Sequence, residues 1–287
     1  MRDNKNKQGG NKKPSRNSGE RGKRGFGKPY GKGGPQKFVK KAKGDPLPTF
    51  SEDVRLNKFI ANAGICSRRE ADVLIQTGIV EVNGKIITEM GYKVKPTDEV
   101  KYDGRIIQSE KKQYVLLNKP KDFITTMDDP MGRRTVLQLV NNACKERIYP
   151  VGRLDRNTTG LLLFTNDGDL AKRLTHPRYE VTKIYHVELD RPISVEHVKA
   201  LCAGVELDDG DFVKADVAEI IKDTRNREVG VELHSGKNRV VRRMFEAIGF
   251  KVVKLDRVKF AGLTKKDLPR GRWRHLDEKE VNFLKMV

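Results

Sequence analysis

The stretch Val151–Leu170, "VGRLDRNTTGLLLFTNDGDL", places a carboxylate among cations directly before an apolar run. Asp155 stands between Arg153 and Arg156, and the apolar 161–164 segment follows a short polar run. Four consecutive apolar residues have the length of a buried strand. An aspartate beside arginines is most often a structural ion pair in a loop, but the same arrangement also keeps a carboxylate ionised for chemistry. These residues alone leave both interpretations open.

The sequence around this stretch predicts an α+β domain over residues 113–287. Short or alternating apolar runs predict strands, and three helical segments lie among them. This pattern favours a mainly antiparallel mixed sheet with flanking helices. The expected strands are 114–120, 161–164, 181–190, 211–221, 228–234 and 251–263. The expected helices are 194–204, 238–249 and a short one within 166–174, for which Asp167 is the candidate N-cap.

A smaller module precedes this domain at residues 54–102. A helix begins near Val54 and ends at Gly64, and Ser67 with Glu70 forms a capping box that starts a second helix. Asn83-Gly84 between apolar runs predicts a hairpin turn. Two helices and a hairpin make a unit near the lower size limit of a domain.

Residues 1–48 form a basic arm of different composition. They contain fifteen Lys and Arg against three acidic residues, which gives +12 of the chain's +20, and ten of the 26 glycines. So few aliphatic residues cannot offset the entropy of folding, so we expect this arm to be disordered. It is either an RNA-contacting tail or a solubilising tail without a specific partner.

Several classes of site are not indicated. The three cysteines are far apart, the five histidines lack ligand spacing, and no dinucleotide or phosphate-binding loop is present. We therefore expect no metal and no cofactor. The absence of a long apolar run or secretory signal, together with the cysteine usage, predicts a cytoplasmic protein without a membrane partner.

The motifs resemble known families. The 54–102 module resembles an S4 RNA-binding domain. The Asp155 stretch resembles the signature of pseudouridine synthases of the RsuA/RluB/RluE/RluF branch, and the RluB group is the most similar. Three further segments match this branch in order, namely "LNKPKDFITT" at 117–126, "KIYHV" at 183–187 and "SGKNRVVRRMFEAIG" at 235–249.

The resemblance implies roles for individual residues. Asp155 is the catalytic nucleophile, Arg242 is the cation that pairs with it, and Tyr185 stacks on the target base. From residue pattern alone, Tyr185 also fits a core position, and Arg242 fits a solvated polar stripe on its helix. The expected contacts to RNA are Lys58, Arg68, Arg69, Lys119, Arg153, Lys237 and Arg239, with Lys119 and Arg153 also serving as loop anchors.

Two positions depart from the family pattern. Asp122 replaces a usual Gly in the first motif, and Asp tolerates left-handed backbone better than most residues. Val240 replaces a usual Gln in the third motif. This change affects a contact that the Gln side chain would make, and it does not affect the catalytic pair of Asp155 and Arg242.

The resemblance predicts a monomeric RNA pseudouridine synthase whose partner is ribosomal RNA, alone or in pre-ribosomal particles. The target uridine is expected in large-subunit 23S rRNA, with small-subunit RNA as the other possibility. The alternative function is a non-catalytic S4-type RNA-binding or ribosome-assembly factor. The target base must leave its stack to reach Asp155, so base flipping is implied.

Overall fold

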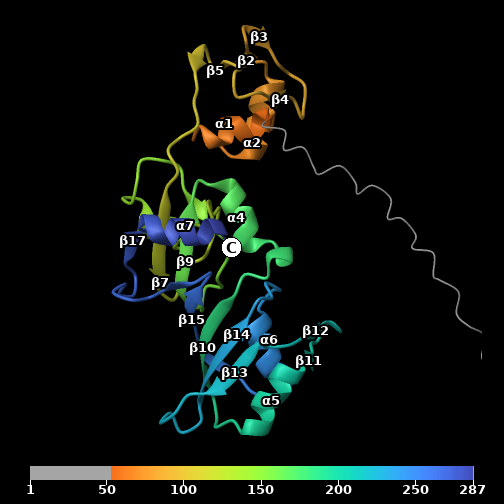
Figure 1. Ribbon diagram of the computed structural model, residues 1–287, viewed down its shortest axis with the longest axis vertical. Coiled ribbons are helices and arrows are strands. Elements are labelled where there is room, and N and C mark those ends of the chain that lie inside the picture. Colours follow the sequence, from red (N-terminus) through yellow and green to blue (C-terminus); the bar gives the residue numbers. More distant parts are fainter. Residues whose placement is uncertain (1–52, 287) are drawn as a thin grey trace, which may run out of the picture. The chain divides into compact units, whose positions relative to one another are not determined.

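The computed structural model describes residues 53–286 (Figure 1). The predictions made for the arm at residues 1–48 lie outside the described residues. Within 53–286, every helix is too short or too polar to cross a lipid bilayer.

The N-terminal module contains the two predicted helices and the hairpin. Ser67 Oγ accepts from the Glu70 amide and the Glu70 carboxylate accepts from the Ser67 amide, so the capping box is confirmed. Asn83 and Gly84 have φ of 51° and 74°, as the predicted turn requires. A four-stranded sheet in the order β3-β2-β5-β6 packs on the helices. The elements are β1 (Val54–Arg55), α1 (Leu56–Asn62), α2 (Arg68–Gln76), β2 (Val80–Val82), β3 (Lys85–Ile86), β4 (Lys93–Val94), β5 (Val100–Tyr102) and β6 (Arg105–Ile106).

The larger part of the described chain is built on one nine-stranded sheet, whose main path runs β13-β14-β10-β15-β9-β7-β17. Every pair in it is antiparallel except β15 with β9, so the predicted mainly antiparallel mixed sheet and the α+β class are confirmed. Its strands are β7 (Tyr114–Lys119), β8 (Tyr149–Pro150), β9 (Thr159–Thr165), β10 (Lys183–Leu189), β13 (Val217–Ile220), β14 (Glu228–Leu233), β15 (Val252–Phe260), β16 (Leu263–Thr264) and β17 (Trp273–His275).

Helices and a small hairpin accompany this sheet. They are α3 (Leu137–Val140), α4 (Gly168–Thr175), the 3-10 turn η1 (Pro177–Tyr179), α5 (Val195–Ala203), the hairpin β11 (Val205–Glu206) and β12 (Phe212–Val213), α6 (Val240–Ala247) and α7 (Glu278–Met286). The predicted 211–221 strand is wrong as one element, because the chain divides between β12 and β13 in different sheets. The sequence patterns did not indicate α3, α7 or β17.

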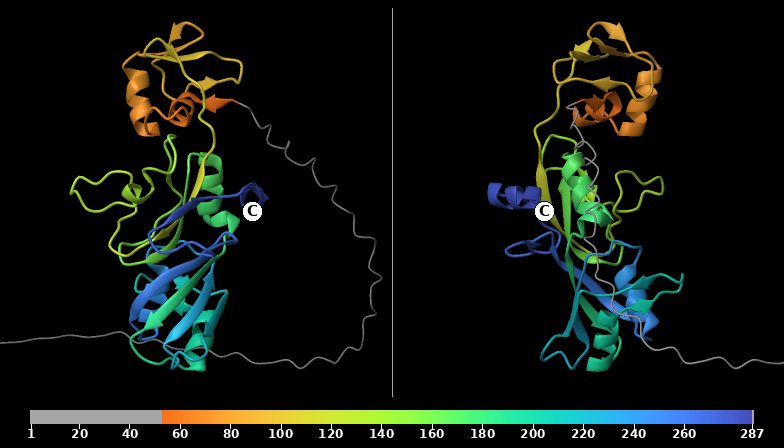
Figure 2. Two further views of the ribbon diagram at one scale, coloured as in Figure 1. Left: turned by 90° about the vertical axis from the view of Figure 1, so that its left-hand side faces the viewer. Right: turned by 45° about the vertical axis from the view of Figure 1, so that its right-hand side comes forward.

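The sheet has two halves with separate cores. One core joins β10, β13 and β14 to α5 and α6, and includes Val187, Val231 and Phe245. In the other half, alternate residues of β9 enter cores on opposite faces, with Leu161 on one side and Leu162 on the other. Covering both faces explains why this strand is an unbroken apolar run. Figure 2 shows the two halves from two sides, with β15 extending from one to the other.

The two halves meet at a short parallel ladder between β9 and β15. Only two residue pairs form it, Thr159 with Asp256 and Gly160 with Arg257. We call these four residues the seam. A two-pair ladder supplies few backbone hydrogen bonds, so side chains must contribute to holding the halves together.

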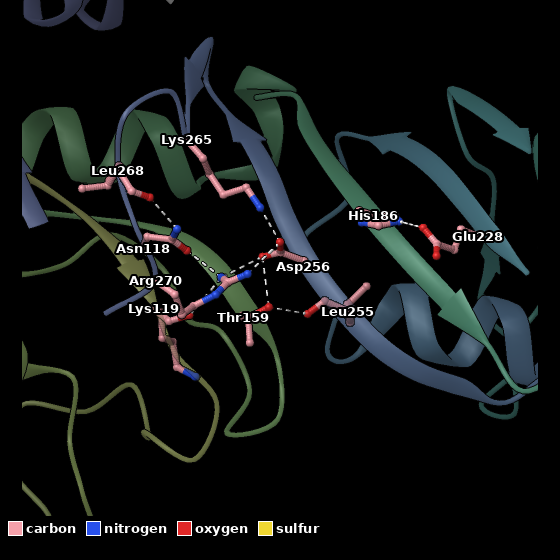
Figure 3. A network of polar contacts seen from close by, with 10 residues as sticks. All are labelled: Asn118, Lys119, Thr159, His186, Glu228, Leu255, Asp256, Lys265, Leu268 and Arg270. Atoms are coloured by element: carbon pink, nitrogen blue, oxygen red, sulfur yellow. Dashed lines mark hydrogen bonds and ion pairs between the residues drawn. The ribbon is translucent and has the colours of Figure 1, made fainter. Parts of the chain in front are cut away.

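Asp256 is the centre of a polar network that reinforces the seam (Figure 3). Its carboxylate accepts two hydrogen bonds from Arg270, at 3.0 Å each, and others from Lys265 and the Thr159 hydroxyl. Burial raises the pKa of Asp256, but the hydrogen bonds and charges of Arg270 and Lys265 outweigh it and lower the pKa to about 2. Arg270 also donates to the Asn118 side chain, so the network reaches β7.

Gly160 is the seam position where only glycine fits. Its φ is +108°, and a Cβ there would lie 2.3 Å from the Arg257 carbonyl oxygen and 2.5 Å from the Arg257 nitrogen. The approach of β15 to β9 therefore depends on the missing side chain.

Candidate active site

Asp155 lies in the loop between β8 and β9, at the seam. Gly152, with φ of 74°, turns the chain out of β8, and the Thr158 amide donates to the Asp155 carbonyl as the chain enters β9. The Asp155 side chain is 37% exposed, so its carboxylate is accessible from outside the protein. Its nearest cation is Arg239, whose Nη1 lies 3.9 Å from Oδ2.

The 117–126 segment holds the backbone of this loop through hydrogen bonds. The Thr125 hydroxyl both donates to the Leu154 carbonyl and accepts from the Leu154 amide, at 2.8 and 3.2 Å. The Asp122 amide donates to the Arg156 carbonyl. Asp122 has φ of 72°, so this position is left-handed and explains the glycine usual there. The first motif thus fixes the backbone on both sides of Asp155.

Lys119 is the central brace and corrects a prediction. Its side chain is fully buried, which rules out the expected phosphate contact, while its role as a loop anchor is supported. A buried ammonium needs acceptors for its protons, and the loop supplies backbone oxygens. Nζ donates to the carbonyls of Pro120, Asp155, Arg156 and Thr158, at 3.1, 3.1, 3.2 and 2.8 Å.

We expect Lys119→Met to destabilise the protein by about 2 kcal/mol at pH 7, because it leaves buried carbonyls without a donor. Burial lowers the pKa of Lys119 to about 8, against an ordinary 10.5. Between these values the unfolded chain binds a proton that the folded chain lacks, so wild-type stability rises with pH. The difference between wild type and variant should therefore widen from pH 8 to pH 10. Urea unfolding at several pH values measures it, and parallel pH curves for the two proteins would contradict the assignment.

A cavity opens beside the Asp155 carboxylate. Its volume is about 160 Å³. A protein cavity of about 150 Å³ can hold a benzene ring, so this one has room for a single six-membered ring. Residues from the loop, β10, the 235–239 segment and β15 line it, among them Arg153, Asp155, Tyr185, Lys237, Arg239 and Arg257.

Tyr185 occupies a core position and also lines the cavity, where stacking on a base stays a prediction. It is 9% exposed and belongs to the core of its half with Val187 and Leu189, while its ring lines the cavity. Its neighbours across the sheet are Val231 and Arg257. The two neighbouring strands hold its backbone, and its aromatic ring offers a surface on which a base can stack.

Arg242 is buried, so its interpretation as part of a solvated stripe is wrong. Its Nη1 donates to the Val252 carbonyl at 2.9 Å, which ties α6 to the start of β15. Burial lowers the pKa of Arg242, and the charge of Asp155 partly opposes this. The charge of Asp155 therefore acts on Arg242 from a distance. The predicted ion pair between these two residues is not formed, and Arg239 is the arginine at ion-pair distance from Asp155. The neighbouring Arg243 pairs with Asp208 and Asp209.

The other predicted RNA contacts fall into two groups. Arg68 and Arg69 are exposed in the first turn of α2, and Arg153 is exposed at the cavity. Two lysines have carboxylate partners in the structure: Lys237 pairs with Asp211 at 2.6 Å, and Lys58 pairs with Asp169 at 2.6 Å.

Two further cations, Lys183 and Arg257, line the cavity without a role predicted from the sequence. Lys183 donates to the Val181 and His234 carbonyls, and burial lowers its pKa to about 8. Arg257 is 3% exposed and lies two residues after the buried Leu255, on the same face of β15. A cation on the apolar face of a strand was the available signal for Arg257.

Among residues 53–286, no cluster of three or more His, Cys, Asp or Glu side chains could hold a metal ion. The cavity is instead lined by Asp155 and several cations. Such a site can hold an ionised nucleophile next to a polyanion.

Comparisons with known proteins agree with this geometry. Residues 113–247 match the family described as RNA pseudouridylate synthase, and residues 54–100 match the S4 domain. A Bacillus subtilis protein named ribosomal large subunit pseudouridine synthase B is 42% identical, over 81% of this chain and 96% of that protein. A Vibrio cholerae protein of the same name is 39% identical, over 80% of this chain and 74% of its own length. A crystal structure of a pseudouridylate synthase is 31% identical with a TM-score of 0.58, over 80% of this chain and 99% of that one.

Proposed function

The chain belongs to the RNA pseudouridylate synthase family, and from that premise we propose that its substrate is one uridine of large-subunit ribosomal RNA. It is an RNA pseudouridine synthase that carries an S4 domain ahead of its catalytic domain. Support for the ribosomal large subunit comes from the names of relatives that match most of this chain. We further propose that it acts as a monomer in the cytoplasm, on free RNA or on pre-ribosomal particles.

The conversion of uridine to pseudouridine requires few catalytic groups. The N1–C1′ bond breaks, the uracil turns while it is held, and C5 bonds to C1′, so no atom is gained except through proton exchange. Asp155 is the proposed nucleophile, because an accessible carboxylate beside a ring-sized cavity can stabilise or trap C1′ as it loses electrons. Attack on C1′ and a glycal-type route both use an ionised carboxylate at this place.

The single observation that carries the proposal is the juxtaposition of Asp155, Tyr185 and Arg239 around this cavity. The target base must be flipped out of the RNA to enter it. Tyr185 supplies a stacking surface, while Arg239 and the buried Arg242 supply positive charge near the carboxylate. The exposed Arg68, Arg69 and Arg153 are proposed phosphate contacts, which position RNA without reading its sequence.

Pseudouridine mapping of ribosomal RNA tests the proposal. In a deletion background, the wild-type gene should restore one pseudouridine in large-subunit RNA. Restoration only in small-subunit RNA would overturn the proposed substrate. Restoration of no site in any ribosomal RNA would favour a non-catalytic RNA-binding or assembly factor.

The basic arm should strengthen RNA binding without being needed for turnover. Residues 1–48 carry a net +12, and each phosphate contact adds to the salt dependence of binding. We expect deletion of this arm to weaken RNA binding and to flatten the plot of log affinity against log salt. Binding titrations at 50 to 200 mM salt measure both quantities. A slope equal to that of the full chain would show that the arm does not touch RNA.

A further inference from the structure

The cavity beside Asp155 contains polar groups that the protein itself leaves unpaired. In the part of the chain from 53 to 286, only four buried side-chain nitrogen or oxygen atoms lack a hydrogen-bond partner. Two of them, Thr158 Oγ1 and Arg257 Nη2, belong to residues that line this cavity. Buried polar groups are nearly always satisfied in folded proteins, so two exceptions at one site need an explanation.

Arg257 is held rigidly at one edge of its guanidinium. Nε donates to the Leu161 carbonyl at 2.8 Å, across the seam, and the guanidinium carbon lies 4.5 Å from the centre of the Phe260 ring. On another side the guanidinium interacts with the Tyr185 hydroxyl. These contacts fix the orientation of the group, and its buried Nη2 has no hydrogen-bond partner in the protein.

No carboxylate neutralises this charge within the described residues. Asp256, the residue before Arg257 on β15, pairs with Lys265 and Arg270. Asp155 lies nearest to Arg239. Burial lowers the pKa of Arg257, but a guanidinium stays protonated in proteins. The cavity therefore has a desolvated, oriented cation at its wall, where a hydrogen bond is stronger than in water.

We propose that Arg257 is a base-recognition residue, which donates from Nη2 to a carbonyl oxygen of the target pyrimidine. This inference rests on the proposed function, because it takes the flipped base as the occupant of the cavity. Uracil has two such oxygens, O2 and O4. Nη2 is shielded from solvent, and Tyr185 is the cavity side chain against the guanidinium. A small movement of Tyr185 onto the face of the base gives the carbonyl access to Nη2.

The contact would act on the chemistry as well as on binding. When the N1–C1′ bond breaks, its electron pair stays with uracil, and the negative charge spreads over N1, O2 and O4. A fixed cation at one of these oxygens stabilises the charge where it develops. The hydroxyl of Thr158 is a second group available to the same base or to its ribose.

The test compares Arg257→Met with wild type on an RNA hairpin that contains the mapped uridine. Three hairpins are used, with uridine, 2-thiouridine or 4-thiouridine at the target, because sulphur is a weaker acceptor than oxygen. Single-turnover rates at saturating enzyme separate the chemical step from binding. The matched control is Arg274→Met, which breaks a partly buried ion pair with Glu280 outside the cavity.

We expect Arg257→Met to lower the single-turnover rate on uridine about a hundredfold, as for the loss of one charge-stabilising donor. Wild type and Arg274→Met should both react more slowly with one of the two thio substrates than with uridine. Arg257→Met should react with that thio substrate and with uridine at the same rate. Arg257→Lys keeps a positive charge but lacks the planar, oriented donors of a guanidinium, so its rate should lie between those of Arg257→Met and wild type.

Two results would overturn the inference. One is a wild-type enzyme that treats all three hairpins alike. The other is an Arg257→Met variant that is slower but keeps the wild-type preference, since this is the behaviour of a purely structural arginine. Each of these results can be read only if the wild-type enzyme forms pseudouridine in the uridine hairpin. If the wild-type enzyme forms no pseudouridine there, the proposed function is overturned and not the role of Arg257, so the two failures are distinguishable.

Discussion

Asp155→Asn is expected to reduce the rate of pseudouridine formation by about 10⁴-fold or more while leaving the fold intact. Asparagine has nearly the same shape but cannot carry the negative charge that C1′ requires, and loss of a nucleophile is among the most damaging single changes in an enzyme. The backbone contacts of the loop, from Lys119 and Thr125, do not involve this side chain. Thermal unfolding should therefore change little.

Single-turnover assays on RNA with the mapped uridine measure this effect. Asp208→Asn is the matched control, because it removes a carboxylate that is 79% exposed and pairs with Arg243 away from the cavity. It should retain the wild-type rate. RNA affinity of Asp155→Asn should remain close to that of wild type, since RNA binding rests on cations. A variant with more than a tenth of the wild-type rate would exclude Asp155 as the nucleophile.

Gly160→Ala is expected to destabilise the protein by about 3 kcal/mol or more and to impair catalysis with it. A φ of +108° is costly for any other residue, and the added Cβ would meet backbone atoms of Arg257 that cannot rotate away. The seam must open to relieve the clash. Opening it moves the Asp155 loop, which leads into β9, relative to Tyr185 on β10.

Urea unfolding measures the destabilisation, with Gly210→Ala as the control. Gly210 also has a positive φ, of 79°, but nothing lies within 4 Å of its Cβ position. That variant bears only the backbone strain, about 1 kcal/mol. Equal destabilisation by the two alanines would show that close packing at the seam does not matter.

Local signals in the sequence predicted much of this structure. The capping box at Ser67, the Asn83-Gly84 turn and the left-handed position of Asp122 each depend on a few neighbouring residues, and all are present. The Asp155 stretch also predicted the loop and strand that build the cavity. Such features follow from short-range sterics and hydrogen bonding, which a sequence displays directly.

What the sequence could not show depends on distant partners. Lys119 looks like any exposed cation until the loop carbonyls 36 to 39 residues away surround its ammonium. Arg257 becomes a cavity residue only because β15 lies beside β9 and β10. Likewise β17 is fixed by pairing with β7, more than 150 residues earlier. None of these neighbours is visible in a local pattern.

The seam also bears on how this enzyme loses activity on heating. Asp155 comes from one half of the sheet and Tyr185 from the other, and each half keeps its own core. Parting of the two-pair ladder therefore separates the reacting groups while the core around β10, β13 and β14 stays intact. Partial openings of this kind need less free energy than complete unfolding. Thermal inactivation should consequently begin at a temperature below the melting transition seen by circular dichroism.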